Sequence, residues 1–116
     1  MAQPFIHIEL RSADAKKAGK FYETLFGWKL QPVPEMKYTL FTAGSGPGGG
    51  MMQAEADGTP HWVPYVSVTQ IEATVKQATA LGAKVRMAVT EIPGQGKVAV
   101  LGDPAGSPIG LFQPAK

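Results

Sequence analysis

The sequence contains no cysteine. This absence excludes a disulfide-stabilised scaffold, an iron–sulfur centre, a cysteine zinc finger and a cysteine nucleophile. A strong charge of one sign is also missing, because 11 Lys and Arg stand against 9 Asp and Glu, for a net charge of +2. The basic residues are scattered, and the longest run is Lys16–Lys17. The sequence therefore lacks the clustered basic patch that nucleic-acid binding needs.

Long hydrophobic runs are missing as well. No apolar segment approaches the roughly 20 residues that a membrane-spanning helix requires, and no basic segment followed by an apolar one marks a signal peptide at the start. We therefore expect a cytoplasmic protein that binds neither membrane nor nucleic acid. The chain does have a globular composition, with 44% apolar and 17% charged residues among 116. This length and composition predict one domain covering residues 1–116.

The chain contains an internal repeat. Residues 38–53 and 98–113 align without a gap at an offset of 60. Each segment runs from an apolar stretch through a Gly/Pro-rich loop to a glycine, two large apolar residues and a glutamine. The paired residues are Gly50 with Gly110 and Gln53 with Gln113. The repeat predicts two similar modules, which we call module one (residues 1–55) and module two (residues 60–116).

Apolar periodicity predicts the order strand, helix and three strands in each module. In module one, Asp14 is expected to cap the helix N-terminus and Gly27 to end the helix in a left-handed conformation. In module two, Thr-x-x-Glu at residues 69–72 predicts a capping box. The buried helix faces are predicted to carry Ala18, Tyr22, Leu25 and Phe26 in module one and Ile71, Val75, Ala78 and Leu81 in module two.

Three segments carry a resemblance to a known superfamily. They are FIHIELRSAD at residues 5–14, FYETLFGW at residues 21–28 and DPAGSPIGLF at residues 103–112. They resemble the vicinal oxygen chelate superfamily, which includes glyoxalase I, bleomycin-resistance proteins and extradiol dioxygenases. The chain is most similar to its small, two-module glyoxalase/bleomycin-resistance-like members. The resemblance implies an α+β fold in which tandem βαβββ modules form a cup-shaped, eight-stranded mixed sheet around a small-molecule cavity, and it implies a homodimer.

Metal-using members of the superfamily take His and Glu ligands from the first and last strands of each module, and the metal polarises substrate oxygens. In this chain, those positions are His7, Gly50, Val63 and Gly110. One ligand of four is present, so we expect no cofactor. The chain is closer in this respect to the bleomycin-resistance branch, which sequesters a drug in a metal-free cleft. The alternative is a divalent metal bound through His7, with Glu9 and His61 nearby.

Strand parity predicts which side chains share a face. His7, Glu9 and Arg11 should lie on one face of the first strand, and Ile8 and Leu10 on the face that packs on the helix. Gly50 and Gly110 should leave room beside the cavity. The residues predicted to bind a ligand are His7, Glu9, Gly50, Met52, His61, Tyr65, Gly110 and Phe112. Tyr38 should lie either opposite the pocket or at its rim.

Two functions follow from this arrangement. In the first, the protein binds a small, partly apolar molecule in the cup without a metal. In the alternative, it is an enzyme, such as a lyase, an isomerase or a dioxygenase-like protein, in which Glu9 or His7 moves a proton with or without a metal. Both residues also have a structural interpretation, His7 as a hydrogen-bonded histidine and Glu9 as the partner of His7 or Arg11. The sequence leaves open whether the protein is an enzyme.

Overall fold

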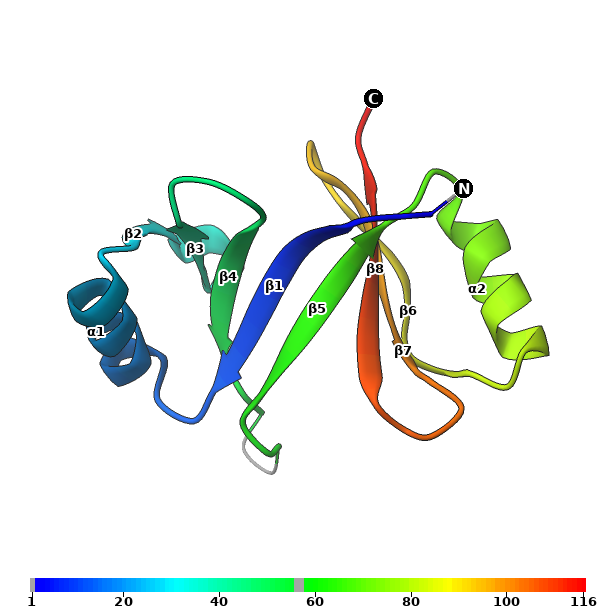
Figure 1. Cartoon of the computed structure of the whole chain (residues 1–116), viewed down its shortest axis with the longest axis horizontal. Helices are drawn as coiled ribbons and strands as arrows, with labels where there is room; N and C mark the ends of the chain where they lie inside the picture. Colours follow the sequence, from blue (N-terminus) through cyan, green and yellow to red (C-terminus); the bar gives the residue numbers. More distant parts are fainter. Residues whose placement is uncertain (1, 56–57) are drawn as a thin grey trace. The chain divides into compact units, whose positions relative to one another are not determined.

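The computed structural model describes residues 2–55 and 58–116, and over these residues the elements follow the predicted order (Figure 1). Module one comprises β1 (Phe5–Ser12), α1 (Ala15–Phe26), β2 (Lys29–Val33), β3 (Tyr38–Thr42) and β4 (Gly48–Gln53). Module two comprises β5 (His61–Ser67), α2 (Ile71–Ala80), β6 (Lys84–Ile92), β7 (Gly96–Gly102) and β8 (Pro108–Pro114). The sequence did not predict the short 3-10 helix η1 (Pro34–Met36) between β2 and β3. The predicted α+β class is confirmed.

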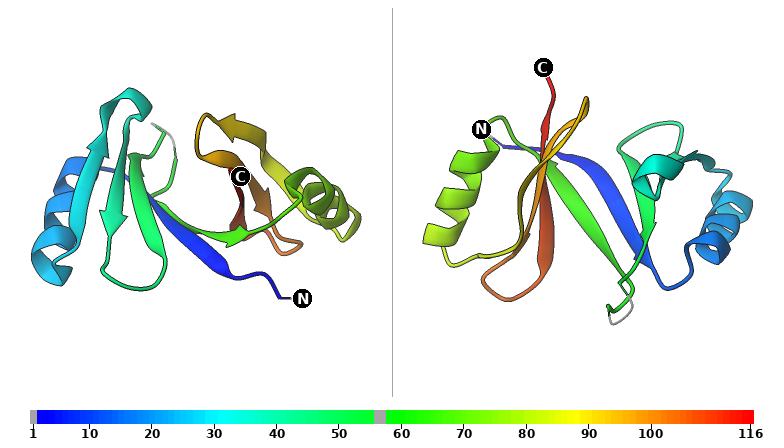
Figure 2. Two further views of the ribbon diagram at one scale, coloured as in Figure 1. Left: turned by 90° about the horizontal axis from the view of Figure 1, so that it is seen from above. Right: turned by 180° about the vertical axis from the view of Figure 1, so that it is seen from behind.

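Both modules have the same sheet topology. In module one the strand order is β2-β3-β4-β1, with β1 parallel to β4 and the other pairs antiparallel. In module two the order is β5-β8-β7-β6, with β5 parallel to β8 and the other pairs antiparallel. In each module the helix lies along one face of its own strands (Figure 2). Each module therefore presents one face to its helix and one face away from it.

The chain divides into two compact units, one of residues 7–63 and one of residues 64–116 together with the segment before His7. The boundary falls inside β1 and β5 rather than in the polar linker. A backbone hydrogen bond joins the segment before His7 to the second unit, because the Ser67 amide donates to the Pro4 carbonyl at 2.8 Å. His61 and Trp62 consequently belong to the unit of module one. No described helix is long and apolar enough to cross a membrane.

The start and end of α1 are as predicted. The Asp14 carboxylate accepts a hydrogen bond from the Lys17 amide at 3.1 Å, and Gly27 ends the helix with φ of 71°. The capping box predicted at residues 69–72 is wrong, because α2 begins after Gln70, whose side chain makes no capping bond. The first amide of α2 has a different partner, which comes from β8.

The repeated glutamines cap the two helices. Gln53 Oε1, at the end of β4, accepts a hydrogen bond from the Ala15 amide at 3.0 Å. Gln113 Oε1, on β8, accepts one from the Ile71 amide at 2.8 Å. The first amides of a helix have no partner within it, so each glutamine satisfies one of them from the last strand of its own module. The same contact in both modules shows what the repeated glutamine does.

The hydrophobic core is larger in module two than in module one. Its buried residues in module two are Val68, Ile71, Ala99, Leu101 and Leu111, each 5% exposed or less. Module one has Leu10, Phe41 and Met51. Leu25, Phe26 and Leu81 were predicted to be buried, but they are 57%, 55% and 71% exposed. Leu81 follows the last residue of α2, and Phe26 packs instead against the neighbouring rings of Tyr22 and Trp28.

Candidate functional site

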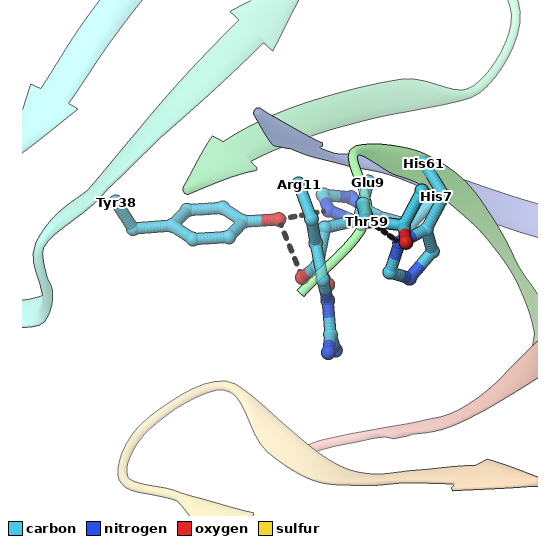
Figure 3. A network of polar contacts seen from close by, with 6 residues as sticks. All are labelled: His7, Glu9, Arg11, Tyr38, Thr59 and His61. Atoms are coloured by element: carbon cyan, nitrogen blue, oxygen red, sulfur yellow. Dashed lines mark hydrogen bonds and ion pairs between the residues drawn. The ribbon is translucent and has the colours of Figure 1, made fainter. Parts of the chain in front are cut away.

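A network of polar side chains lies on the sheet face of module one that points away from α1. Leu10 packs on the helix side, against Ala18 and Tyr22, so the alternation along β1 directs His7, Glu9 and Arg11 to the other face, as predicted. The hydroxyl of Tyr38, from β3, donates to Glu9 Oε1 at 3.1 Å and lies 2.8 Å from His7 Nε2 (Figure 3). Tyr38 therefore links two residues that the sequence singled out.

Glu9 is buried, with 7% of its surface exposed. A buried carboxylate is costly unless it is paired, and both oxygens of Glu9 have partners. Oε1 accepts from the Tyr38 hydroxyl, and Oε2 accepts from Arg11 Nε at 3.0 Å. Because the Arg11 guanidinium only donates hydrogen bonds, its contact with Oε2 and that of Tyr38 with Oε1 fix the orientation of the Glu9 side chain.

His7 is partly buried beside this pair. Burial disfavours the charged imidazolium and lowers the pKa of His7, while the nearby Glu9 carboxylate raises it by a smaller amount. The net effect is a pKa below the ordinary value of 6.5. The ring is therefore mainly neutral at pH 7, and a neutral imidazole has one N–H donor and one acceptor nitrogen.

The two repeated glycines are each covered by a tyrosine ring. A methyl group at Gly50 would overlap the ring of Tyr38, and one at Gly110 would overlap the ring of Tyr65. The tyrosines reach these positions in different ways, because Tyr38 comes from β3 and Tyr65 lies directly opposite Gly110 on β5. The expected room beside the glycines is thus filled by the chain's own rings. The sequence signal for this was a glycine in a strand interior, which often marks close approach of another group.

The fold and this site can be compared with known proteins. Residues 7–112 match the model of a family described as the glyoxalase-like domain. The chain belongs to this family. It is 33% identical over 99 residues to the putative glyoxylase CFP32 of Mycobacterium bovis, covering 82% of this chain and 38% of that protein. It is 24% identical to the anthracycline biosynthesis protein DnrV of Streptomyces peucetius, covering 90% of this chain and 45% of that protein. The chain spans less than half the length of these curated relatives.

Solved structures show the same fold. Methylmalonyl-CoA epimerase of Mycobacterium tuberculosis superposes with a TM-score of 0.72 at 16% identity, covering 97% of this chain and 88% of the epimerase. A glyoxalase/bleomycin resistance protein/dioxygenase superfamily member from Vibrio splendidus 12B01 gives a TM-score of 0.69 at 16% identity, covering 98% and 100% of the two chains. The match to the glyoxalase-like family, together with this shared fold, confirms the membership of the vicinal oxygen chelate superfamily that the sequence motifs indicated.

The residues of this glyoxalase-like domain do not fit the divalent metal that the superfamily implies. A catalytic site of this kind needs at least three nitrogen or oxygen ligands. Gly50 and Gly110 have no donor atom and are covered by rings, and Val63 is apolar and fully buried. His7 Nε2 is already bonded to Tyr38. Within residues 2–55 and 58–116, no group of three or more His, Cys, Asp or Glu could hold a metal ion.

The other predicted residues with side chains come from β4, β5 and β8. His61 Nδ1 bonds to the Thr59 carbonyl at 2.6 Å (Figure 3). Met52 is half-buried and pairs with Arg11 across β4 and β1. In module two, Tyr65 is buried and Phe112 is half-buried on β8. The structure therefore unites His7 and Glu9 and adds Tyr38 and Arg11. For Tyr38 the sequence had left two positions open, and Arg11 was identified only as sharing a face with His7 and Glu9.

The helix side of module one has a different character. A cavity of about 90 Å³ lies between Ile8, Trp28, Phe41 and neighbouring residues. A second, of about 350 Å³, lies near Leu10 and Tyr22. Trp62 lines both cavities, and its ring meets that of Tyr22 at 5.6 Å. Module one thus has an aromatic face toward α1 and a polar face away from it.

Proposed function

We propose that this glyoxalase-like protein binds a small, partly apolar molecule without a metal, using the polar face of module one. The observation that supports this best is the position of Tyr38. Its ring covers the glycine where metal-using relatives place a carboxylate, and its hydroxyl engages both His7 and Glu9. The face retains fixed polar groups for recognising a ligand, while metal ligands are lacking.

We also propose that the protein works in the cytoplasm as a homodimer and without nucleic acid. The scattered basic residues and the net charge of +2 support the last point. Gel filtration with light scattering tests the dimer, because a mass close to 12.3 kDa at all concentrations would contradict it.

Elemental analysis tests the metal-free proposal. Tag-free protein would be incubated with Mg²⁺, Mn²⁺, Fe²⁺, Co²⁺, Ni²⁺ and Zn²⁺ and then desalted. We expect far less than one equivalent of any metal per chain. About one equivalent in the natural sequence, lost in His7→Ala but kept in His61→Ala, would overturn the proposal and favour a metal-dependent enzyme.

Ligand binding is tested by thermal shift with a panel of small aromatic and aliphatic molecules. A ligand that binds only the folded protein raises its stability by mass action. We expect hits whose shift is lost in Glu9→Gln and kept in Glu72→Gln, since Glu72 is an exposed carboxylate on α2. If no molecule of the panel stabilises the protein, or if both variants behave alike, the proposed site is wrong.

A second candidate is an enzyme that moves a proton with Glu9 or His7. The observation in its favour is that three titratable groups touch one another, which is typical of acid–base sites. Relatives named as glyoxylases and a structural neighbour named as an epimerase are consistent with it. Deuterium uptake from D₂O into a panel of small carbonyl compounds is the test. Uptake that is abolished by Glu9→Gln would support the enzyme, and uptake equal to the buffer blank would exclude it for this panel.

A further inference from the structure

The helix α1 packs closely on one part of its sheet and leaves a cavity beside another part. Gly19 is buried, and a methyl group added there would come within 3.2 Å of Leu30 on β2 and of Met51 on β4. On the side of β1 and the start of β5, the wall includes the short side chains of Ser12 and Ala18. A cavity of about 350 Å³ lies there, which we call the α1 cavity. Its volume is at the lower end of the range of about 300–1,000 Å³ that is typical of small-molecule sites.

Two aromatic rings line the α1 cavity. The rings of Tyr22 and Trp62 meet edge to face, with centroids 5.6 Å apart and planes at 71°. Trp62 is 38% exposed, so its indole keeps surface that the chain itself does not cover. Two rings at this angle can contact a flat molecule on its face and along its edge. Such rings are typical of the walls of small-molecule sites.

The exposed apolar residues of α1 lie along the same side of the helix. Ala18, Phe21, Tyr22 and Leu25 are spaced i, i+3, i+4 and i+7 and therefore share a face. Ala18 and Tyr22 line the cavity, and Phe21 and Leu25 continue the face into solvent. A face that borders a cavity is not covered by a packed core, which is consistent with the exposure of Leu25.

His61 brings a ring nitrogen of defined role to the cavity wall. Its Nδ1 lies 2.6 Å from the Thr59 carbonyl, which can only accept, so Nδ1 carries a hydrogen (Figure 3). In the neutral ring, Nε2 is then the acceptor nitrogen. Of the described residues that line the cavity, none is Asp, Glu, Lys or Arg. A wall without carboxylate, ammonium or guanidinium groups matches an uncharged ligand.

We propose that module one has a second binding site, the α1 cavity, which takes a flat, uncharged aromatic molecule with one hydroxyl group. Its rings lie against Trp62 and Tyr22, and its hydroxyl bonds to His61. The site is separate from the polar face, because β1 directs Leu10 into the cavity and Glu9 to the opposite face. The lining residues all belong to the compact unit of residues 7–63. The inference does not require a ligand at the polar face.

The experiment is a titration of the ¹⁵N-labelled protein with 2-naphthol, followed through the indole N–H signals of its two tryptophans. Trp28→Phe and Trp62→Phe assign the two signals. Trp62 lines both cavities of module one, whereas Trp28 lines the smaller one. We expect a saturable shift of the Trp62 signal and a smaller shift of the Trp28 signal. A Trp62 signal that stays in place, or that moves less than that of Trp28, would overturn the inference.

Ala18→Leu tests the location, because the larger side chain occupies part of the cavity. We expect it to weaken 2-naphthol binding by about tenfold or more, the scale expected for overfilling a packed site. Ala73→Leu, at an exposed alanine of α2, is the matched control and should leave the affinity unchanged. Glu9→Gln alters the polar face and should not weaken the binding either. Binding that survives Ala18→Leu, or that is lost in Glu9→Gln, would contradict the proposed location.

The role of His61 is tested with two probes of similar shape, and this test does not depend on the folding of Ala18→Leu. In 2-methylnaphthalene a methyl group replaces the hydroxyl of 2-naphthol. His61→Leu should weaken 2-naphthol binding by about three- to tenfold, as expected for the loss of one hydrogen bond. It should leave the affinity for 2-methylnaphthalene unchanged. If His61→Leu affects both probes equally or neither, the proposed ligand class is wrong.

A second copy of the chain is the other candidate occupant of the α1 cavity. Light scattering of the natural sequence with and without 2-naphthol, and of Ala18→Leu, distinguishes the two occupants. We expect the same mass in all three samples. A mass that falls on addition of 2-naphthol or in Ala18→Leu would mean that a second copy fills the cavity, and the inference would fail. The proposed function is tested by variants of the polar face, so its failure and the failure of this inference can be told apart.

Discussion

The two modules share their backbone plan but differ in how well their helices are packed. In the core that α2 forms with its sheet, Ile71 and Ala99 are fully buried and Val68 is 1% exposed. Around α1, by contrast, Phe21 and Phe26 are 56% and 55% exposed. Since burial of apolar surface is the main favourable term in folding, module two contributes the denser core.

The sheet faces that point away from the helices also differ, and here module one has the more polar residues on its first strand. In module one, the first strand presents His7 and Glu9, and Glu9 lies opposite Gly50. In module two, the corresponding positions are Val63 and Tyr65, and Tyr65 lies opposite Gly110. The repeat therefore preserves the backbone and the glutamine caps, whereas the histidine and the carboxylate of the first strand have no counterpart at the corresponding positions of module two.

The largest expected effect tests the difference in packing. Ile71→Ala should lower the free energy of unfolding by about 2–5 kcal/mol, because it removes a fully buried side chain and leaves a cavity. Leu25→Ala, at a side chain that is 57% exposed, should cost less than about 1 kcal/mol. Urea unfolding followed by circular dichroism measures both. Equal losses in the two variants would show that the packing of the modules does not differ as described.

The next largest effect is expected at the two glycines that tyrosine rings cover. Gly50→Ala and Gly110→Ala should each destabilise the protein by about 1–3 kcal/mol, because the new methyl group overlaps a tyrosine ring.

The double variants Gly50→Ala/Tyr38→Ala and Gly110→Ala/Tyr65→Ala check the cause, since residues in contact give non-additive effects. Each double variant should lose less stability than the sum of its two single variants. Additive losses would mean that the rings do not collide with the methyl groups.

The helix caps should behave alike in both modules. Gln53→Ala and Gln113→Ala each leave the first amide of a helix without its side-chain partner. By analogy with other N-terminal caps, each should cost about 0.5–2 kcal/mol in unfolding free energy. Gln113→Glu keeps an acceptor oxygen near the helix N-terminus and should retain most of the stability. A loss in one module only would argue against the shared role of the repeated glutamines.

The smallest effect is a pH dependence that should come from module one. The pKa of His7 is lowered in the folded protein, so the unfolded chain binds more protons near and below its ordinary value of 6.5. The contribution of His7 to stability should therefore be present above about pH 6.5 and be lost as the pH falls through the lowered folded pKa. Denaturant midpoints between about pH 8 and pH 5.5 measure this, and His7→Gln should flatten the profile relative to His61→Gln. Identical profiles for the two variants would exclude His7 as the cause.

The sequence alone determined the features that depend on neighbouring residues. The βαβββ order, the alternation of His7 and Glu9 with Leu10, and the Asp14 cap follow from periodicity and local hydrogen bonding within a few residues. The repeat of Gly50 and Gln53 was also visible in the sequence, although the contacts that these residues make were not. These features are predictable because their physical causes act along a short stretch of chain.

The tertiary structure decided which side chains contact one another across strands. Tyr38 reaches His7 and Glu9 only because β3 pairs with β4 in a register that puts Leu40 opposite Gly50. Likewise, α2 is capped from β8 by Gln113 and not by the local Thr-x-x-Glu pattern. Contacts between segments some 30 to 40 residues apart depend on how the sheet pairs its strands, and no local pattern encodes that register. The repeat showed that the two halves are alike, and the tertiary structure showed where they differ.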